Sequence, residues 1–105
     1  MQHVSVYVTC PDEETAVRIA RDLLDKRLVA CANVVPRVRS LYRWEGRVQD
    51  EREVAMFMKT RRALVPDVLR EARALHPHEV PCIVAFDLAA GEKDYLSWVA
   101  EATKG

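Results

Sequence analysis

The sequence predicts one α+β domain, in which helices cover an antiparallel sheet. Three observations predict this fold class: apolar residues alternate with period two in some segments, they recur at helical spacing in others, and the elements follow the order β-α-β-β-α-β-α. Two βαβ halves joined by a hairpin form the split, ferredoxin-like arrangement. We expect both main helices on one sheet face. The other face is left for the last helix or for neighbouring subunits.

The first two elements are a strand over residues 3–10 and the helix that follows it. Valines alternate with polar residues in the strand. Pro11 suits the first helical turn, and the acidic residues after it suit the positive end of a helix. Apolar residues then recur at helical spacing as far as Leu24, and we expect the helix to end near Arg27 and Leu28.

The central stretch, residues 30–61, predicts two long strands joined by a tight turn at 45–47. An arm of about 14 residues spans roughly 45 Å at 3.3 Å per residue. A domain of this size has a diameter of about 35 Å, so the hairpin tip should overhang. An exposed apolar ribbon needs a cover, and we predict an obligate homo-oligomer. Tyr42 and Trp44 are then interface anchors rather than a ligand shelf.

The register of this hairpin stays open. A two-residue turn at Glu45 and Gly46 pairs even positions of one arm with odd positions of the other, yet the apolar faces are even on both arms. A three-residue loop with a left-handed glycine, or a bulge near Pro36, would restore the match. Pro36 could also divide the first arm into two short strands, but we expect a bulge there.

The remaining elements are a helix, a strand and a last helix. The stripe of the first of these helices consists of Leu64, Val68, Ala72 and Leu75. Pro66 fits its first turn, and Pro77 ends it. Residues 80–88 are almost wholly apolar, so we expect a buried, central strand. Gly91 then leads into a helix whose apolar face holds Tyr95, Trp98, Val99 and Ala102.

Composition excludes several function classes. Sixteen Lys and Arg balance sixteen Asp and Glu, and zero net charge argues against a nucleic-acid partner. No apolar run approaches the roughly 18 residues of a membrane span. Three cysteines without a C-x-x-C pair indicate reduced thiols in a cytoplasmic protein. With only three glycines and no catalytic triad, we expect neither an organic cofactor nor an enzyme.

The densest polar cluster is the run His-Pro-His-Glu at 76–79. His76 and His78, followed by a carboxylate, are ligands that copper or zinc accepts, and a Cys10 thiolate would suit Cu(I). A structural interpretation competes with this one. His76 would cap the last helical carbonyls, His78 would be solvated, and Cys10 would be a small buried thiol.

Four further residues carry weaker hypotheses. Cys31 and Cys82 fall inside predicted strands, where we expect buried thiols. Lys59 would hold an anionic ligand or form an ion pair with Glu79, and the structural pair is favoured. Asn33, flanked by small residues, would bond backbone groups at a subunit junction.

At these residues the chain resembles the CutA family of divalent-cation-tolerance proteins. The matching runs are ACAN at 30–33, SLYRWEG at 40–46, EVAMFMKT at 53–60, HPHEVP at 76–81 and YLSW at 95–98. Together they cover nearly the whole chain. The resemblance implies a ferredoxin-like subunit in a tight homotrimer, similar in plan to PII signalling proteins. It also implies a link to copper and other divalent ions, with no enzymatic reaction attached.

Two departures from the family bear on a metal site. The family commonly has Tyr after His-Pro, where this chain has His78, which either adds a ligand or exchanges one ring for another. Some bacterial members place a His directly before His-Pro and a Cys in the first strand, as a proposed copper site. Leu75 and Val8 occupy those positions here. Only His76 is carried over, with Cys10 displaced by two residues.

The leading function is therefore a trimeric, cytoplasmic protein of divalent-cation tolerance that binds metal ions without catalysis. The alternative is a PII-like signalling or scaffold module that binds a small anion or a partner protein between subunits. Its candidate residues are Lys59, Glu79, Asn33, Tyr42 and Trp44. An acylphosphatase-like enzyme would need a glycine-rich anion loop after the first strand, which the sequence lacks.

Overall fold

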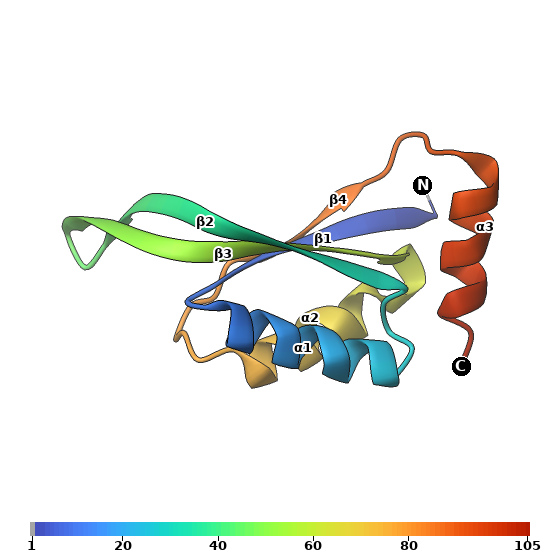
Figure 1. The fold of residues 1–105 in the computed structure, drawn as a ribbon, viewed down its shortest axis with the longest axis horizontal. Coiled ribbons are helices and arrows are strands. Elements are labelled where there is room, and N and C mark those ends of the chain that lie inside the picture. Colours follow the sequence, from blue (N-terminus) through green and yellow to red (C-terminus); the bar gives the residue numbers. More distant parts are fainter. Residues whose placement is uncertain (1) are drawn as a thin grey trace.

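A computed structural model describes residues 2–105 as a four-stranded antiparallel sheet with helices packed against it. The elements are β1 (His3–Cys10), α1 (Glu13–Asp25), β2 (Cys31–Trp44), β3 (Arg47–Arg61), the short 3-10 helix η1 (Arg62–Leu64), α2 (Val65–Leu75), β4 (Ile83–Asp87) and α3 (Lys93–Ala102). The strand order is β2-β3-β1-β4. Helices α1 and α2 cover one face of the sheet (Figure 1). The predicted α+β, split βαβ arrangement is confirmed.

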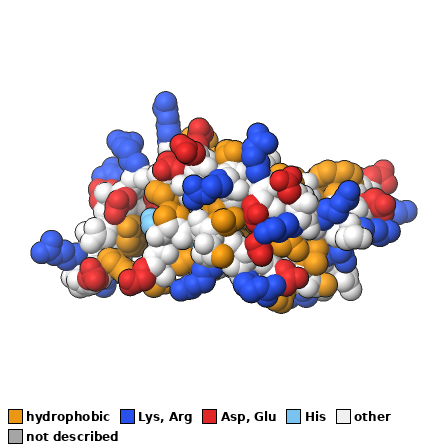
Figure 2. All heavy atoms as spheres, turned by 90° about the horizontal axis from the view of Figure 1, so that it is seen from below, with side chains coloured by type: hydrophobic (Ala, Val, Ile, Leu, Met, Phe, Trp, Pro, Cys, Tyr) orange, Lys and Arg blue, Asp and Glu red, His pale blue; other side chains and the backbone are white. Residues whose placement is uncertain are grey.

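The hydrophobic core lies between the sheet and the pair α1 and α2. Because strand side chains alternate between faces, the even-numbered residues of β1 all point into it. Its largest fully buried members include Val4, Val6, Val8, Ile19, Leu23, Met56, Met58 and Val68. The outer surface of the helix layer carries charged side chains of both signs along its length (Figure 2). That surface is therefore the solvent-facing side of the domain.

Both ends of α1 differ from the prediction. The Asp12 side chain accepts a hydrogen bond from the backbone N–H of Thr15 at 2.8 Å and caps the helix. Pro11 therefore lies before the cap and outside the first turn. Asp12 takes the cap position because its carboxylate accepts a helical N–H, for which a proline side chain has no acceptor atom. At the other end Arg27 takes a left-handed φ of 57°, so the helix stops at Asp25, earlier than expected.

The hairpin of β2 and β3 overhangs the helices, as its length predicts (Figure 1). The long axis of the molecule is 44 Å, against 25 and 22 Å for the others. Trp44 pairs with Arg47, so the loop has two residues and not three. Glu45 and Gly46 both take positive φ, 50° and 77°, as a type I′ turn requires.

A β-bulge at Pro36 and Arg37 restores the match between the two apolar faces. Val35 lies opposite Ala55, whereas Val38 lies opposite Glu53, so β2 carries one extra residue between these pairs. The even-numbered residues of β2 therefore face the helices before the bulge and the uncovered sheet face after it. We call this uncovered face, opposite α1 and α2, the open face.

Strand β4 is an edge strand, so the prediction of a buried, central strand over 80–88 is wrong. It spans only five residues and pairs with β1 alone. Val84 and Phe86 are 44% and 55% exposed. Phe86 lies on the open face, where its ring packs 6.5 Å from the ring of Tyr7, measured between centroids. A strand that is apolar on both faces looks buried in the sequence, but this chain does not cover its open face.

Helix α3 packs at the end of the sheet opposite to the hairpin tip (Figure 1). The Arg61 guanidinium donates hydrogen bonds to the hydroxyl and carbonyl oxygens of Thr103, both at 2.9 Å. Of the predicted apolar face, Val99 is buried, whereas Tyr95 and Trp98 remain exposed. None of the helices formed by residues 2–105 is long and apolar enough to cross a lipid bilayer.

Candidate functional site

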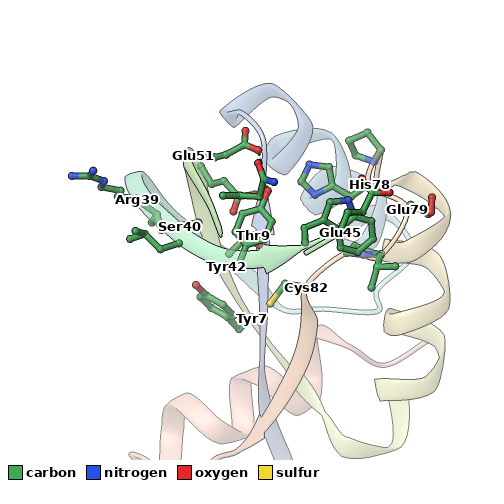
Figure 3. A pocket seen from close by; sticks show the side chains of 18 residues that line it. Tyr7, Thr9, Arg39, Ser40, Tyr42, Glu45, Glu51, His78, Glu79 and Cys82 are labelled. Atoms are coloured by element: carbon green, nitrogen blue, oxygen red, sulfur yellow. Dashed lines mark hydrogen bonds between the residues drawn. The ribbon is translucent and has the colours of Figure 1, made fainter. Parts of the chain in front are cut away.

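An open groove of about 1190 Å³ separates the overhanging hairpin from the segment that joins α2 to β4. Hairpin residues between 38 and 53 form one wall, residues 77–82 form the other, and Tyr7 and Thr9 of β1 contribute to the lining (Figure 3). The bulge explains this arrangement, because it turns Tyr42 and Trp44 toward the open face. The predicted interface anchors thus also line a groove within one chain.

The groove is acidic. Its lining includes Glu45, Glu51, Glu53 and Glu79. Arg39 is the one Arg or Lys in its lining, and both its Nε and its Nη2 donate to the Asp50 carboxylate, at 2.8 and 2.6 Å. Figure 3 shows the Arg39 guanidinium pointing away from the groove. Carboxylates that line a concave surface favour cations there over anions.

Glu53 is the most enclosed of these carboxylates, with 9% of its surface exposed. No hydrogen bond or ion pair holds it among residues 2–105, whereas Glu51 accepts a hydrogen bond from the Tyr42 hydroxyl at 3.0 Å. That bond raises the pKa of Tyr42, and burial raises the pKa of Tyr7. Sequence reasoning missed Glu53 as a site residue; its one signal was a glutamate directly before the core-like part of β3.

His76 is buried and uses both ring nitrogens inside the chain. Its Nε2–H donates to the Thr9 carbonyl oxygen at 2.7 Å, and its Nδ1 accepts the backbone N–H of His78 at 3.1 Å. Its own backbone N–H bonds the Arg73 carbonyl, so the expected capping by its ring is not observed. His76 therefore ties the segment after α2 to the end of β1.

Exposed donor atoms of the groove lie on the wall formed by residues 77–82. His78, Glu79 and Cys82 are exposed and belong to the lining of the groove, with Cys82 near Tyr7 (Figure 3). The His78 ring packs against the His76 ring, with 4.8 Å between centroids. Cys82 precedes β4 and is exposed, so the prediction that it is a buried strand residue is wrong.

Cys10 lies on the helix-facing side of β1, fully buried in the core. Burial raises the pKa of its thiol to about 11. Its thiol therefore keeps its proton at neutral pH, whereas a metal ligand must be the thiolate. This placement agrees with the structural interpretation of Cys10.

The remaining candidates lie away from the groove. Lys59 pairs in register with Cys31 near the opposite end of the sheet, so the expected Lys59–Glu79 ion pair is absent from the described residues. Cys31 is only partly buried, and its Sγ lies 3.3 Å from the Tyr95 hydroxyl oxygen. Asn33 is exposed on the edge strand β2.

The described residues of one chain do not form a complete metal site. Within residues 2–105, no three His, Cys, Asp or Glu side chains gather closely enough to hold a metal ion. A structural zinc site needs four such ligands. Within the described residues the groove therefore offers negative charge and fewer than three clustered ligands, and further ligands would have to come from water or from a second copy.

Comparison with known proteins extends these observations. Residues 4–102 match the model of a family described as "CutA1 divalent ion tolerance protein". A Thermus thermophilus protein named divalent-cation tolerance protein CutA is 43% identical over 98 residues, which are 93% of this chain and 95% of that protein. The mouse protein CutA is 40% identical over 100 residues, 95% of this chain. The chain spans about half of that relative's length, 56%.

Solved structures with the same fold include two with near-complete coverage. The Thermus thermophilus divalent cation tolerance protein has a TM-score of 0.94 at 41% identity, over 97% of this chain and 99% of that one. A protein described as the periplasmic divalent cation tolerance protein CutA from Archaeoglobus fulgidus has a TM-score of 0.94 at 39% identity, with the same coverage. The sheet, the helices and the long hairpin are thus shared with these proteins.

Proposed function

Because the chain belongs to the CutA1 divalent ion tolerance family, we propose that it acts in divalent-cation tolerance by binding metal cations in the acidic groove, as a homotrimer and without catalysis. One observation carries the proposal. The groove has four glutamates, and Arg39, the one Arg or Lys in its lining, is bonded to Asp50 outside it. Such a surface concentrates cations and repels anions.

The donor atoms on the groove wall favour copper or zinc among divalent ions. Imidazole and thiolate ligands suit these metals, whereas carboxylate and water suit magnesium and calcium. His78, Glu79 and Cys82 are exposed to an incoming ion. His76 joins them only after it releases the Thr9 carbonyl or the His78 N–H. Cys10 does not join them, because its thiol lies in the core on the helix-facing side of β1 and outside the groove lining. We therefore assign first contact to His78 and Glu79.

The homotrimer is supported by surfaces that one chain leaves uncovered. Tyr42 and Trp44 on the hairpin, and Val84 and Phe86 on β4, are 38% to 55% exposed. Strands β2 and β4 each leave one edge unpaired within the described residues. A neighbouring copy would cover these rings and edges, and it would supply the ligands that one groove lacks.

We also propose a cytoplasmic location, because all three cysteines are free. Unpaired thiols persist in reducing compartments, whereas oxidising ones favour disulfides. Fractionation of cells that produce the chain tests this proposal. Recovery in a periplasmic or secreted fraction would overturn it.

Calorimetric titration of untagged protein with Cu(II) and Zn(II) tests the metal site. We expect the double variant His78→Ala/Glu79→Gln to weaken binding by at least about ten-fold, or 1.4 kcal/mol. Glu101→Gln is the matched control, since Glu101 is an exposed glutamate of α3 outside the groove. Equal affinity of the double variant and the control would contradict the assignment.

The alternative, a PII-like module that binds a small anion, is favoured by one observation. Lys59 is partly buried and has no ion pair among residues 2–105. An anionic ligand would then lie near Lys59 and not in the acidic groove. A thermal-shift series with nucleotides and carboxylates tests this, with Lys59→Ala as the variant. A ligand that stabilises the wild type but not the variant would favour the alternative.

A further inference from the structure

The overhanging hairpin has a second face, opposite to the open face. After the bulge, the odd-numbered residues of β2 and the even-numbered residues of β3 share this second face. We call it the hairpin underside, and it consists of Arg39, Leu41, Arg43, Val48, Asp50 and Arg52. All six residues are exposed, and the hairpin carries them past the ends of α1 and α2 (Figure 1). One chain therefore leaves both faces of its overhang uncovered.

Positive charge on the hairpin underside is only partly balanced. Arg39 stands directly opposite Arg52, and like charges in that position repel each other. Asp50 is the one carboxylate of this face, and the Arg39 guanidinium bonds both of its oxygens. The guanidinium groups of Arg43 and Arg52 make no hydrogen bond or ion pair within residues 2–105. An anionic partner would therefore find two guanidinium groups that the chain does not pair.

A pocket of about 240 Å³ lies between Arg39, Asp50 and Arg52. Arg39, and to a lesser extent Arg52, lowers the pKa of the Asp50 carboxyl group, so both guanidinium groups act on the same pocket. The planar fork of an arginine matches the two oxygens of a carboxylate. The pocket therefore suits an acidic side chain from a partner, bound to Arg52.

Two aliphatic side chains lie beside these charges. The register makes Leu41 and Val48 diagonal neighbours on the hairpin underside. Each is 64% exposed, whereas Tyr42 and Trp44 on the open face are 39% and 38% exposed. A homotrimer built through the open face covers the two rings and leaves Leu41 and Val48 in water. The hairpin underside therefore offers apolar surface to a different partner.

The composition of the hairpin underside distinguishes between kinds of anionic partner. Single-stranded nucleic acids are held by aromatic rings that stack on bases, and surfaces at a lipid interface are enriched in Trp and Tyr. The rings of this hairpin, Tyr42 and Trp44, lie on the opposite face. Leu41 and Val48 instead match aliphatic side chains, and arginine matches carboxylates. A protein segment with both kinds of side chain complements the hairpin underside.

We propose that the hairpin underside binds an acidic, aliphatic segment of another protein. Carboxylates of the segment pair with Arg43 and Arg52. An aliphatic side chain of the segment packs on Leu41 and Val48. This surface is separate from the acidic groove, so the binding does not depend on metal. Phosphate and other small anions lack the aliphatic contact, so the hairpin underside should not hold them.

The first test measures the fluorescence anisotropy of a labelled peptide in which glutamate alternates with leucine, in low-salt buffer without metal ions. We expect Arg43→Gln/Arg52→Gln to weaken binding of this peptide by at least about ten-fold, and Leu41→Ser to weaken it as well. Arg21→Gln and Leu24→Ser are the matched controls, since both residues are exposed on α1, and they should bind like the wild type. A wild type that does not bind the peptide, or equal binding by the double variant and its control, would overturn the proposal.

Two further peptides separate the contribution of charge from that of aliphatic contact. One has glutamine in place of glutamate, and the other has serine in place of leucine. We expect each to bind the wild type at least about ten-fold more weakly than the first peptide. Equal binding of the serine peptide would show that charge alone holds the ligand, which would contradict the proposal.

The second test separates the rival occupants. We expect neither phosphatidylserine vesicles nor a single-stranded oligonucleotide to bind the wild type as tightly as the first peptide does. If either binds more tightly, and Arg43→Gln/Arg52→Gln abolishes that binding, the surface serves a membrane or a nucleic acid and the proposal fails. If light scattering shows that Leu41→Ser weakens self-association, a second copy covers the surface and the proposal fails.

Urea denaturation shows that a loss of peptide binding is not a loss of the fold. Arg52→Gln removes one of two directly opposed like charges, so we expect this variant to unfold at the same urea concentration as the wild type or at a higher one. Peptide binding that is lost in such a stable, folded variant supports the proposal.

Discussion

Val38 of β2 lies opposite Glu53 of β3, because one extra residue enters β2 between this pair and the pair of Val35 with Ala55. The bulge turns the outer half of β2 over. It places Tyr42 on the same sheet face as Glu53. The groove, its acidic charge and its aromatic lining all depend on this change of register.

Arg37 should tolerate glycine better than a neighbouring strand residue does. It takes φ of 65° in the bulge, a left-handed conformation that costs a non-glycine residue about 1 kcal/mol. We expect Arg37→Gly to leave the free energy of unfolding within about 0.5 kcal/mol of the wild type or to raise it. Arg43→Gly, in a regular part of β2, should lower it by about 1 kcal/mol. Urea denaturation compares the two, and equal losses would contradict the role of the bulge.

His76 and His78 should differ sharply in their effect on stability. His76→Ala leaves the Thr9 carbonyl and the His78 N–H without their partner, so we expect a loss of about 2–3 kcal/mol in the free energy of unfolding. His78→Ala removes an exposed ring and should cost no more than about 0.5 kcal/mol. Thermal and urea unfolding measure both. A small effect of His76→Ala would show that its ring does not hold this segment.

Local patterns were sufficient to predict most of the fold. The first strand, the bulge at Pro36 and the order of elements follow from alternation and turn chemistry, which act over a few residues. The loop length of the hairpin stayed open in the sequence, and the pairing of Trp44 with Arg47 decides it. Strand β4 was misplaced because an apolar edge strand and a buried central strand share one pattern. Its open face needs a cover that lies outside a single chain. Pro11 was misplaced because Asp12 caps α1.

The candidate site was predicted only in part. His78 and Glu79 stand out in the sequence as a dense polar run, and both line the groove. Glu53 does not stand out, because its burial depends on the register set by the bulge and on the distant segment 77–82. The Lys59–Glu79 pair failed for the same reason, since position along the sheet is not a local property.

Cys10 should resist alkylation that modifies Cys82. At about pH 8 the Cys10 thiol is buried and protonated, because burial raises its pKa to about 11, whereas Cys82 is exposed. Mass spectrometry after iodoacetamide treatment should show Cys82 modified first and Cys10 modified only in denatured protein. Equal rates in the native protein would contradict the burial of Cys10.

The raised pKa of the Cys10 thiol also predicts how the stability of the protein depends on pH. Burial raises the pKa of the Cys10 thiol from its ordinary 9.0 to about 11 in the folded state, so between these pH values the folded state binds this proton more tightly than the unfolded state does. Its contribution to stability is therefore complete below pH 9 and is lost as the pH rises toward 11. Urea denaturation at pH values from 9 to 11 should show that the free energy of unfolding falls less with pH in Cys10→Ala than in the wild type. An equal fall in the variant would show that side chains other than Cys10 cause the pH dependence.

Trp44 should contribute to assembly, whereas an equally exposed residue on the helix layer should not. Trp44 and Leu24 are both 38% exposed, but Trp44 is on the hairpin and Leu24 is on α1. We expect Trp44→Ser to weaken self-association by at least about ten-fold and Leu24→Ser to leave it unchanged. Sedimentation and light scattering measure both. A wild type that stays monomeric at micromolar concentration would contradict the predicted trimer.

The central claim is that the acidic groove makes this protein a binder of cations. The most direct measurement is the melting temperature of untagged protein in two parallel series, one with Cu(II) and Zn(II) and one with phosphate, citrate and ATP without metal. A ligand that binds only the folded state stabilises it by about 2.7 kcal/mol at one hundred times its dissociation constant. The account predicts a concentration-dependent rise with the metal ions, reduced in His78→Ala/Glu79→Gln, and none with the anions. A rise with the anions alone would contradict it.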